Sequence, residues 1–225
     1  QLQGVSDKDY YKFTVNGPGK IIVNFDPTIN NSYDDYFYVM VQDSNGQILS
    51  RVATGKEANF SAYIENSGDY YILIESTGRL DGDNYTIDYQ FQAGTDTYEV
   101  ERNETANTAT PITLDNFYNG QIYSNDDVDY FSFTIDQPGS IDLTFNPSVD
   151  NSYDDYYNLS IRNSSGSTLA SSSTGNDSTL TSAAESAGTY YVRITSTGRW
   201  QDANYQFKVN STAGLEGSEV ESNNS

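Results

Sequence analysis

The sequence predicts an all-β protein made of two tandem antiparallel β-sandwich domains with a jelly-roll-like topology. The 225-residue chain repeats itself without a gap when residue 1 is laid over residue 121. Apolar residues alternate with polar ones, which is the pattern of half-buried strands, and turn-forming residues separate these runs. No segment carries the 3.6-residue period of an amphipathic helix. Because a period of 120 residues is far longer than a solenoid unit, each repeat is one domain.

Three pairs of segments carry the repeat most clearly. Each pair has the same or similar residues at the same relative positions. The pairs are 9–14 with 129–134, Asn31–Tyr36 with Asn151–Tyr156, and Ser76–Arg79 with Ser196–Arg199.

Five alternating runs per repeat predict strands. A further strand is expected only in the second repeat, over Ile112–Phe117. The apolar positions of the five runs are Tyr11/Phe13/Val15, Ile21/Val23/Phe25, Phe37/Val39/Val41, Tyr70/Ile72/Ile74 and Tyr85/Ile87/Tyr89, with their counterparts 120 residues later.

Turn residues lie between the runs. Pro18-Gly19 and Pro138-Gly139 are typical of type II turns, in which Pro sets φ and Gly accepts a positive φ. Asn45-Gly46, with Ser165-Gly166 at the same place in the second repeat, predicts a hairpin.

The repeat also predicts the domain boundaries. We expect a first domain over 1–97 that lacks an N-terminal linker and first strand, and a second domain over 98–213 that has both. Residues 214–225 are expected to begin a linker to a further repeat, because Glu219, Glu221 and Asn223 repeat the spacing of Glu99, Glu101 and Asn103. The chain is therefore interpreted as part of a longer one.

Composition excludes several function classes. The chain has 11 basic and 32 acidic residues, a net charge of −21, and neither His nor Cys. Nucleophile systems that need His or Cys, zinc or copper sites built from nitrogen or sulfur, and disulfides are all excluded. The negative charge argues against binding nucleic acid, and no apolar run is long enough to span a membrane.

Two acidic segments have the spacing of a calcium site. One runs from Glu99 to Glu104 and the other from Asp126 to Asp129. Calcium takes six to eight oxygen ligands, mostly carboxylates and carbonyls, which two such segments could supply together if they meet at a sheet edge. The alternative for most of the acidic residues is a solvated surface.

These segments resemble the bacterial pre-peptidase C-terminal domain family, especially the branch containing the collagen-binding domains of clostridial collagenases. The similar motifs are Glu-x-Glu-x-Asn-Glu-Thr at 99–105, Gly120, and Asp-x-x-Asp-Tyr-Phe at 126–131. Later features, Gly188-Thr189-Tyr190-Tyr191 and Asn204-Tyr205, are similar too, so the resemblance covers nearly all of both repeats.

The resemblance implies that the linker folds back onto the sandwich and encloses a pair of calcium ions. Glu104 stands where the family often has Asp. In the first repeat Asp9 matches Asp129, but Ser6 matches Asp126 and the linker is absent, so no intact site is expected there. The implied ligands are Glu99, Glu101, Asn103, Glu104, Gln121, Asp126 and Asp129.

Aromatic residues at outward or polar-flanked positions are candidates for a ligand-binding surface, with ordinary outer-face tyrosines as the alternative. The loops that contain Asp34-Asp35 and Asp154-Asp155 could hold a second metal or form Asx turns. The candidate aromatic residues are Tyr33, Tyr36, Tyr71, Tyr153, Tyr156, Tyr191 and Trp200.

We therefore predict a non-catalytic, monomeric, calcium-binding accessory module of a secreted bacterial protein such as a protease or other hydrolase. Its partner is expected to be an extracellular polymer, either a protein fibre or a polysaccharide, or a cell surface. The alternatives are a calcium-rigidified structural repeat of an adhesin or surface stalk, and a glycan-binding module. No constellation of a nucleophile with a base favours an enzyme.

Overall fold

The chain folds into two compact β-sheet units, Gln1–Asp96 (unit 1) and Thr97–Ser225 (unit 2), in a computed structural model. The structure describes residues 1–79, 84–94, 97–148, 153–199 and 203–214. Within these ranges every regular element is a strand, and none forms a helix long and apolar enough to cross a bilayer. The division falls one residue before the predicted boundary.

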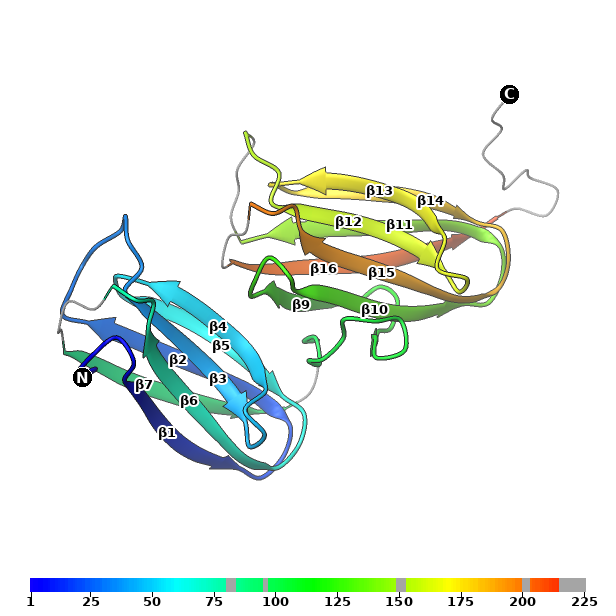
Figure 1. The fold of residues 1–225 in the computed structure, drawn as a ribbon. Helices are drawn as coiled ribbons and strands as arrows, with labels where there is room; N and C mark the ends of the chain where they lie inside the picture. The colour runs from blue at the N-terminus through cyan, green and yellow to red at the C-terminus, as the bar shows by residue number, and fades with distance from the viewer. Residues whose placement is uncertain (80–83, 95–96, 149–152, 200–202, 215–225) are drawn as a thin grey trace. The chain divides into compact units, whose positions relative to one another are not determined.

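Unit 1 is a sandwich of a four-stranded and a three-stranded antiparallel sheet (Figure 1). One sheet has the order β1-β6-β3-β4 and the other has the order β5-β2-β7. The strands are β1 (Lys8–Val15), β2 (Gly19–Pro27), β3 (Phe37–Asp43), β4 (Ile48–Thr54), β5 (Ala58–Ile64), β6 (Gly68–Ser76) and β7 (Tyr85–Ala93).

Unit 2 repeats these seven strands and adds two. The sheets have the orders β13-β12-β15-β10-β8 and β14-β11-β16-β9, antiparallel except for the pairing of β8 with β10. The strands are β8 (Thr110–Pro111), β9 (Phe117–Ile122), β10 (Val128–Ile135), β11 (Gly139–Pro147), β12 (Tyr157–Asn163), β13 (Thr168–Thr174), β14 (Ser178–Ala184), β15 (Gly188–Ser196) and β16 (Ala203–Ala213).

The two cores are built alike, which confirms the predicted all-β sandwich fold. In unit 2, ring centroids of Phe145 lie 5.1 Å from Tyr157 and 5.4 Å from Tyr205. The matching rings of unit 1, Phe25 with Phe37 and Tyr85, are 5.1 and 5.3 Å apart. Burying a side chain of this size contributes about 1.5–3 kcal/mol, so these rings stabilise the contact between the two sheets.

Unit 1 departs from the expected burial at two positions. Tyr11 is 38% exposed and Tyr89 is 46% exposed, whereas their counterparts Phe131 and Val209 are 0% exposed. In unit 2 the segment between β8 and β9 covers this corner: Asp115 donates its backbone N–H to Val209, and Ile112 joins the core. No described residue of unit 1 provides such a cover.

The predicted strand over Ile112–Phe117 is wrong. Strands lie only at its borders: β8 pairs with β10, and β9 pairs with β16. Between them Asp115 adopts φ of 67° and turns the chain. The strands β4, β5, β13 and β14 were not expected, since small and polar residues interrupt their alternation.

The predicted hairpins are confirmed, but the type II turns are not. Gly46 and Gly166 both have φ of 82° between β3 and β4 and between β12 and β13. Gly19 and Gly139 instead begin strands without a positive φ. A side chain at Gly139 would come within 2.0 Å of the Thr212 carbonyl oxygen, so glycine is needed there for close packing.

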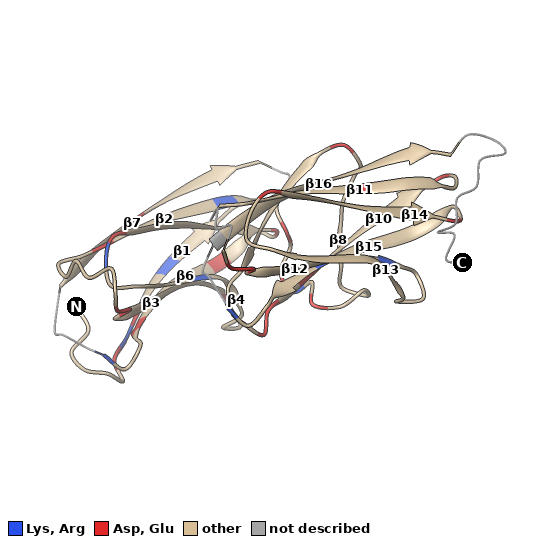
Figure 2. Cartoon of the chain, turned by 90° about the horizontal axis from the view of Figure 1, so that it is seen from above, with Lys and Arg blue, Asp and Glu red and all other residues tan. Residues whose placement is uncertain are grey.

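Most Asp and Glu residues of the described chain lie outside the strands, as the red segments of Figure 2 show. Charges in such positions are solvated and contribute little to stability. The few that are buried therefore need a separate explanation, and they gather at one end of unit 2.

Candidate metal centre

The segment that enters unit 2, residues 97–105, begins beside β9 and is called the linker segment. Tyr98 bridges to Asn119, and the backbone N–H of Glu99 donates to the Asn119 carbonyl at 2.9 Å. This places the Glu99 side chain inside the unit, where its Oε1 accepts from the backbone N–H of Gln121 at 2.6 Å. The linker segment is thus held to the sheet edge by ordinary backbone pairing.

Gly120 makes room for this arrangement. It lies opposite Tyr205 in the β9–β16 register. A Cβ at Gly120 would come within 2.3 Å of the Tyr205 ring and hydroxyl and within 2.6 Å of Glu99 Oε2. Only glycine lets these two side chains approach at this point.

Tyr205 joins two carboxylates from different parts of the chain. Its hydroxyl lies 3.2 Å from Glu99 Oε2 and 2.5 Å from Asp129 Oδ2. Asp129 belongs to β10 and is fully buried. The linker segment and the sheet therefore meet at a pair of carboxylates that share one hydroxyl donor.

Glu101 and Asn103 belong to the linker segment, which backbone hydrogen bonds hold beside β10. The backbone N–H of Tyr130 donates to the Asn103 carbonyl at 2.8 Å, and Val100 N–H donates to Thr110 Oγ1 at 3.0 Å. These bonds fix the segment over the start of β10. We define the acidic cluster as Glu99, Glu101, Asn103, Asp127 and Asp129.

Several oxygens of the acidic cluster are buried without a hydrogen-bond donor among the described residues. They are both carboxylate oxygens of Glu101, Oδ1 of Asn103 and Oδ1 of Asp129. Leaving such groups unsatisfied costs about 1–3 kcal/mol each, and more when they are charged. One oxygen each from Glu99, Glu101 and Asp129 lie within 4.8 Å of one another, so a single ion could contact all three.

The raised pKa values of the carboxylates in the acidic cluster also indicate a cation site. Burial, followed by the charges of Asp129 and Glu101, raises the pKa of Glu99 well above its ordinary value. Burial, followed by the charge of Asp129, does the same to the pKa of Glu101. The pKa of Asp129 is also raised, first by burial and then by Asp127, although the Tyr205 hydroxyl opposes this. Without a cation, the folded unit opposes full ionisation of its own carboxylates.

The structure brings together most, but not all, of the implied ligands. Glu104 is half-buried, and its charge helps to raise the pKa of Glu101. Gln121 is buried and uses its backbone N–H on Glu99. Asp126 is exposed and is not brought into the acidic cluster.

Asp127 occupies the buried position instead of Asp126. The turn that begins at Ser124 directs its side chain inward, where Oδ2 accepts from the Tyr123 N–H at 2.7 Å. The sequence contained a signal for this: Asp127 and Asp129 both recur in the first repeat, as Asp7 and Asp9, whereas Asp126 does not.

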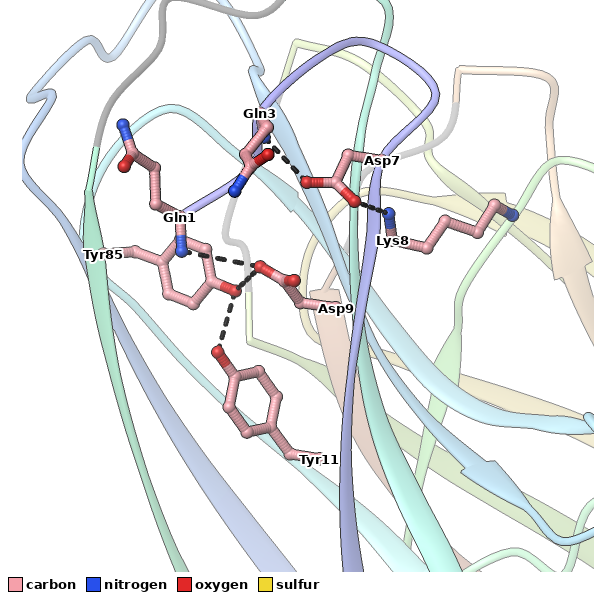
Figure 3. Close-up of polar contacts among 7 residues, drawn as sticks. All are labelled: Gln1, Gln3, Asp7, Lys8, Asp9, Tyr11 and Tyr85. Carbon is pink, nitrogen blue, oxygen red and sulfur yellow. Dashed lines mark hydrogen bonds and ion pairs between the residues drawn. The ribbon is translucent and has the colours of Figure 1, made fainter.

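Unit 1 retains the counterparts of the acidic-cluster residues that belong to the sandwich, but not those of the linker segment (Figure 3). The Tyr85 hydroxyl donates to Asp9, as Tyr205 does to Asp129, and lies 2.9 Å from the Tyr11 hydroxyl. Asp7 accepts the backbone N–H groups of Gln3 at 2.7 Å and of Lys8 at 3.0 Å. The described part of unit 1 offers no counterparts of Glu99, Glu101 and Asn103.

The candidate aromatic residues are not equally exposed. Tyr33 and Tyr153 are 96% and 94% exposed, at equivalent loop positions. Tyr36 and Tyr156 pack against their cores. Tyr71 and Tyr191 are half-buried and make edge contacts with Tyr10 and Tyr130, and Trp200 lies outside the described residues.

The loop at Asn31–Tyr36 forms an Asx turn. Asn31 Oδ1 accepts the backbone N–H groups of Tyr33 and Asp34 at 2.8 and 3.2 Å. Asp34 pairs with Arg79, and Asp154 pairs with Arg199 in unit 2. These acids already have cationic partners, which favours the turn interpretation over a second metal site.

One known family matches part of the chain. Residues 127–196 match the sequence profile of the bacterial pre-peptidase C-terminal domain. A search of curated protein sequences returned no match.

Several solved structures can be superposed on this chain with low TM-scores. Tandem CBM51 modules of a family 98 glycoside hydrolase from Streptococcus pneumoniae share 9% identity over 95% of this chain and 83% of theirs, with a TM-score of 0.32. The human MASP-1/3 CUB1-EGF-CUB2 fragment shares 11% over 90% and 93%, with a TM-score of 0.29. A tandem CBM22 domain from Paenibacillus barcinonensis shares 10% over 90% and 82%, with a TM-score of 0.25.

Proposed function

We propose that this chain is a non-catalytic, calcium-binding accessory module of a secreted bacterial protein, such as a protease or other hydrolase. In this role it binds an extracellular polymer or a cell surface. The observation that carries the calcium part is the acidic cluster, with its buried, unsatisfied oxygens from two segments of the chain.

The donor set fits calcium rather than a softer metal. Every candidate ligand atom is a carboxylate or amide oxygen, and the chain has no His or Cys. Two ligands on opposite sides of a calcium ion are about 4.6–5.2 Å apart, which agrees with three oxygens lying within 4.8 Å. Glu99, Glu101, Asn103 and Asp129 would hold the ion, with Glu104 and Asp127 adding charge nearby.

Calcium supplies positive charge that offsets the repulsion among these carboxylates. The chain's own residues do the positioning: Tyr205 orients Glu99 and Asp129, and Gly120 leaves space for both. Because the ligands come from the linker segment and from β10, binding would tie this segment to the sandwich and add to folding stability.

The similarity to the pre-peptidase C-terminal domain supports the secreted, accessory part of the proposal. It covers 127–196, most of the unit 2 sandwich but not the linker segment. The ungapped repeat favours a second candidate function, a calcium-rigidified spacer in a surface stalk. A spacer would bind calcium but no polymer.

Calorimetric titration of the chain with calcium tests the metal assignment. We expect one saturable binding process in the wild type and at least tenfold weaker binding in Glu101→Gln. Asp126→Asn is the matched control, since it removes a nearby charge from an exposed side chain and should leave binding unchanged. Absence of binding heat in the wild type, or equal losses in both variants, would contradict the assignment.

A further inference from the structure

The outer face of one sheet in unit 2 differs from the rest of this acidic chain. Outward residues of β13, β12, β15 and β10 are placed side by side by the strand registers. None of them is acidic. We call this set the arginine face: Thr168, Ser171, Ser173, Asn158, Ser160, Arg162, Tyr191, Arg193, Thr195, Val128, Tyr130 and Ser132.

Two arginines of the arginine face surround Tyr130. Arg162 Nη1 donates to the Tyr130 hydroxyl at 2.7 Å, and the Arg193 guanidinium lies 5.8 Å from the Tyr130 ring centroid. Neither arginine forms an ion pair with a carboxylate of the described residues, and Arg162 Nε is buried without an acceptor there. Both side chains are half-buried, so each is held in place and keeps donors for a ligand.

On the equivalent face of unit 1, two lysines pair with carboxylates, and Arg51 of β4 lies 4.7 Å from the Tyr38 ring centroid. Lys8 pairs with Glu75 at 2.5 Å and Lys12 pairs with Asp69 at 2.7 Å. The same positions in unit 2 hold Val128 with Thr195 and Ser132 with Thr189, which carry no charge. Gln42 and Leu73 stand where unit 2 has Arg162 and Arg193. The two positive charges are therefore particular to unit 2 and are not a requirement of the fold.

A polar groove of about 500 Å³ lies over β12 and β13, and both arginines line it. The rest of its lining consists mainly of hydroxyl and amide groups, among them Asn158, Ser160 and Ser171. The cores of protein interfaces are more apolar than this. Hydroxyl and amide groups pair well with sugar hydroxyls, and guanidinium groups pair with carboxylates.

We propose that the arginine face binds an acidic polysaccharide whose carboxylates are spaced along the chain, such as one with a single uronate per disaccharide. Charge complementarity favours an anion at Arg162 and Arg193. The net charge of −21 opposes the binding of densely charged polymers such as nucleic acids, which carry one charge about every 1.7 Å. A polysaccharide with widely spaced charges is repelled less. This deepens the polymer-binding part of the proposed function and does not depend on calcium.

Binding of the full chain to immobilised hyaluronate, with neutral dextran and poly-glutamate as comparison polymers, tests the proposal. We expect binding to hyaluronate alone, weakened about tenfold by R162Q and by R193L, as expected for the loss of a charge-assisted bond. Both variants introduce residues that unit 1 carries at the same places, so the fold should persist. R199Q, which removes an equal charge elsewhere in unit 2, should bind as the wild type does.

Three results would overturn the proposal: no preference for hyaluronate over dextran, unchanged binding in both R162Q and R193L, or equal arginine-dependent binding to poly-glutamate, which would indicate an acidic protein partner. Calcium titration of the same variants separates this from the metal assignment, because they should bind calcium normally.

Discussion

Asp129 is fully buried, and its two oxygens are in different situations. Oδ2 accepts from Tyr205, whereas Oδ1 has no donor among the described residues. The same carboxylate therefore opposes folding when no metal is bound and favours it when calcium supplies the missing positive charge. A substitution that removes the charge but keeps the shape should have opposite effects in the two states.

Asp129→Asn should raise the melting temperature of the metal-free protein by a few degrees and weaken calcium binding at least about tenfold. Thermal unfolding with and without a chelator, together with calorimetric titration, measures both effects. Asp9→Asn is the matched control, since Asp9 is the repeat counterpart that lacks linker ligands. If Asp129→Asn destabilises the metal-free protein, repulsion within the acidic cluster is not the dominant effect.

The raised pKa values predict how the metal-free protein responds to pH. Glu99, Glu101 and Asp129 have pKa values above those of the unfolded chain. Their contribution to stability is complete below the ordinary carboxyl range, near 4, and is lost as pH rises through the raised values. Metal-free unit 2 should therefore melt at a lower temperature at pH 7.5 than at pH 5, and saturating calcium should remove this loss. A melting temperature that rises from pH 5 to pH 7.5 without metal would contradict the account.

At the scale of elements, β9 links the linker segment to the sandwich. Its pairing with β16 places Gly120 against Tyr205. Gly120→Ala should destabilise unit 2 by about 1–3 kcal/mol, because the added methyl collides with the Tyr205 ring and with Glu99. Calcium binding should weaken as well, since Glu99 must move.

Chemical denaturation of Gly120→Ala beside Gly17→Ala measures this effect. Gly17 is the control because a Cβ there would have no neighbour within 4 Å and its φ is not positive. Equal stability of the two variants would show that the close packing at β9 is not needed.

Sequence patterns predicted the elements whose chemistry is local. Alternation at period 2 located the core strands, and Asn45-Gly46 located a hairpin. The strand expected over Ile112–Phe117 failed because apolar residues there pack onto β10 and β16 from a loop, which only the tertiary fold requires. Glu99, Glu101, Asn103 and Asp129 were candidates from spacing and family resemblance, but whether Asp126 or Asp127 points inward depends on the turn at Ser124.

At the scale of the whole molecule, two units share one sandwich design but differ in what they add to it. Unit 2 carries the linker segment, the acidic cluster and the arginine face. Unit 1 keeps Asp7, Asp9 and Tyr85, but its described residues do not provide the linker ligands, and Gln42 and Leu73 replace the two arginines. Calcium should therefore act on one unit of the two.

The most direct measurement is thermal unfolding of the whole chain with calcium and with a chelator, followed by calorimetry and by fluorescence of Trp200, which is the single Trp and belongs to unit 2. At a calcium concentration about a hundredfold above the dissociation constant, binding adds about 2.7 kcal/mol. The account predicts that the melting temperature of unit 2, reported by Trp200, rises by about 8 °C or more, while the melting temperature of unit 1 stays unchanged. A Trp200 transition at the same temperature in calcium and in chelator would contradict it.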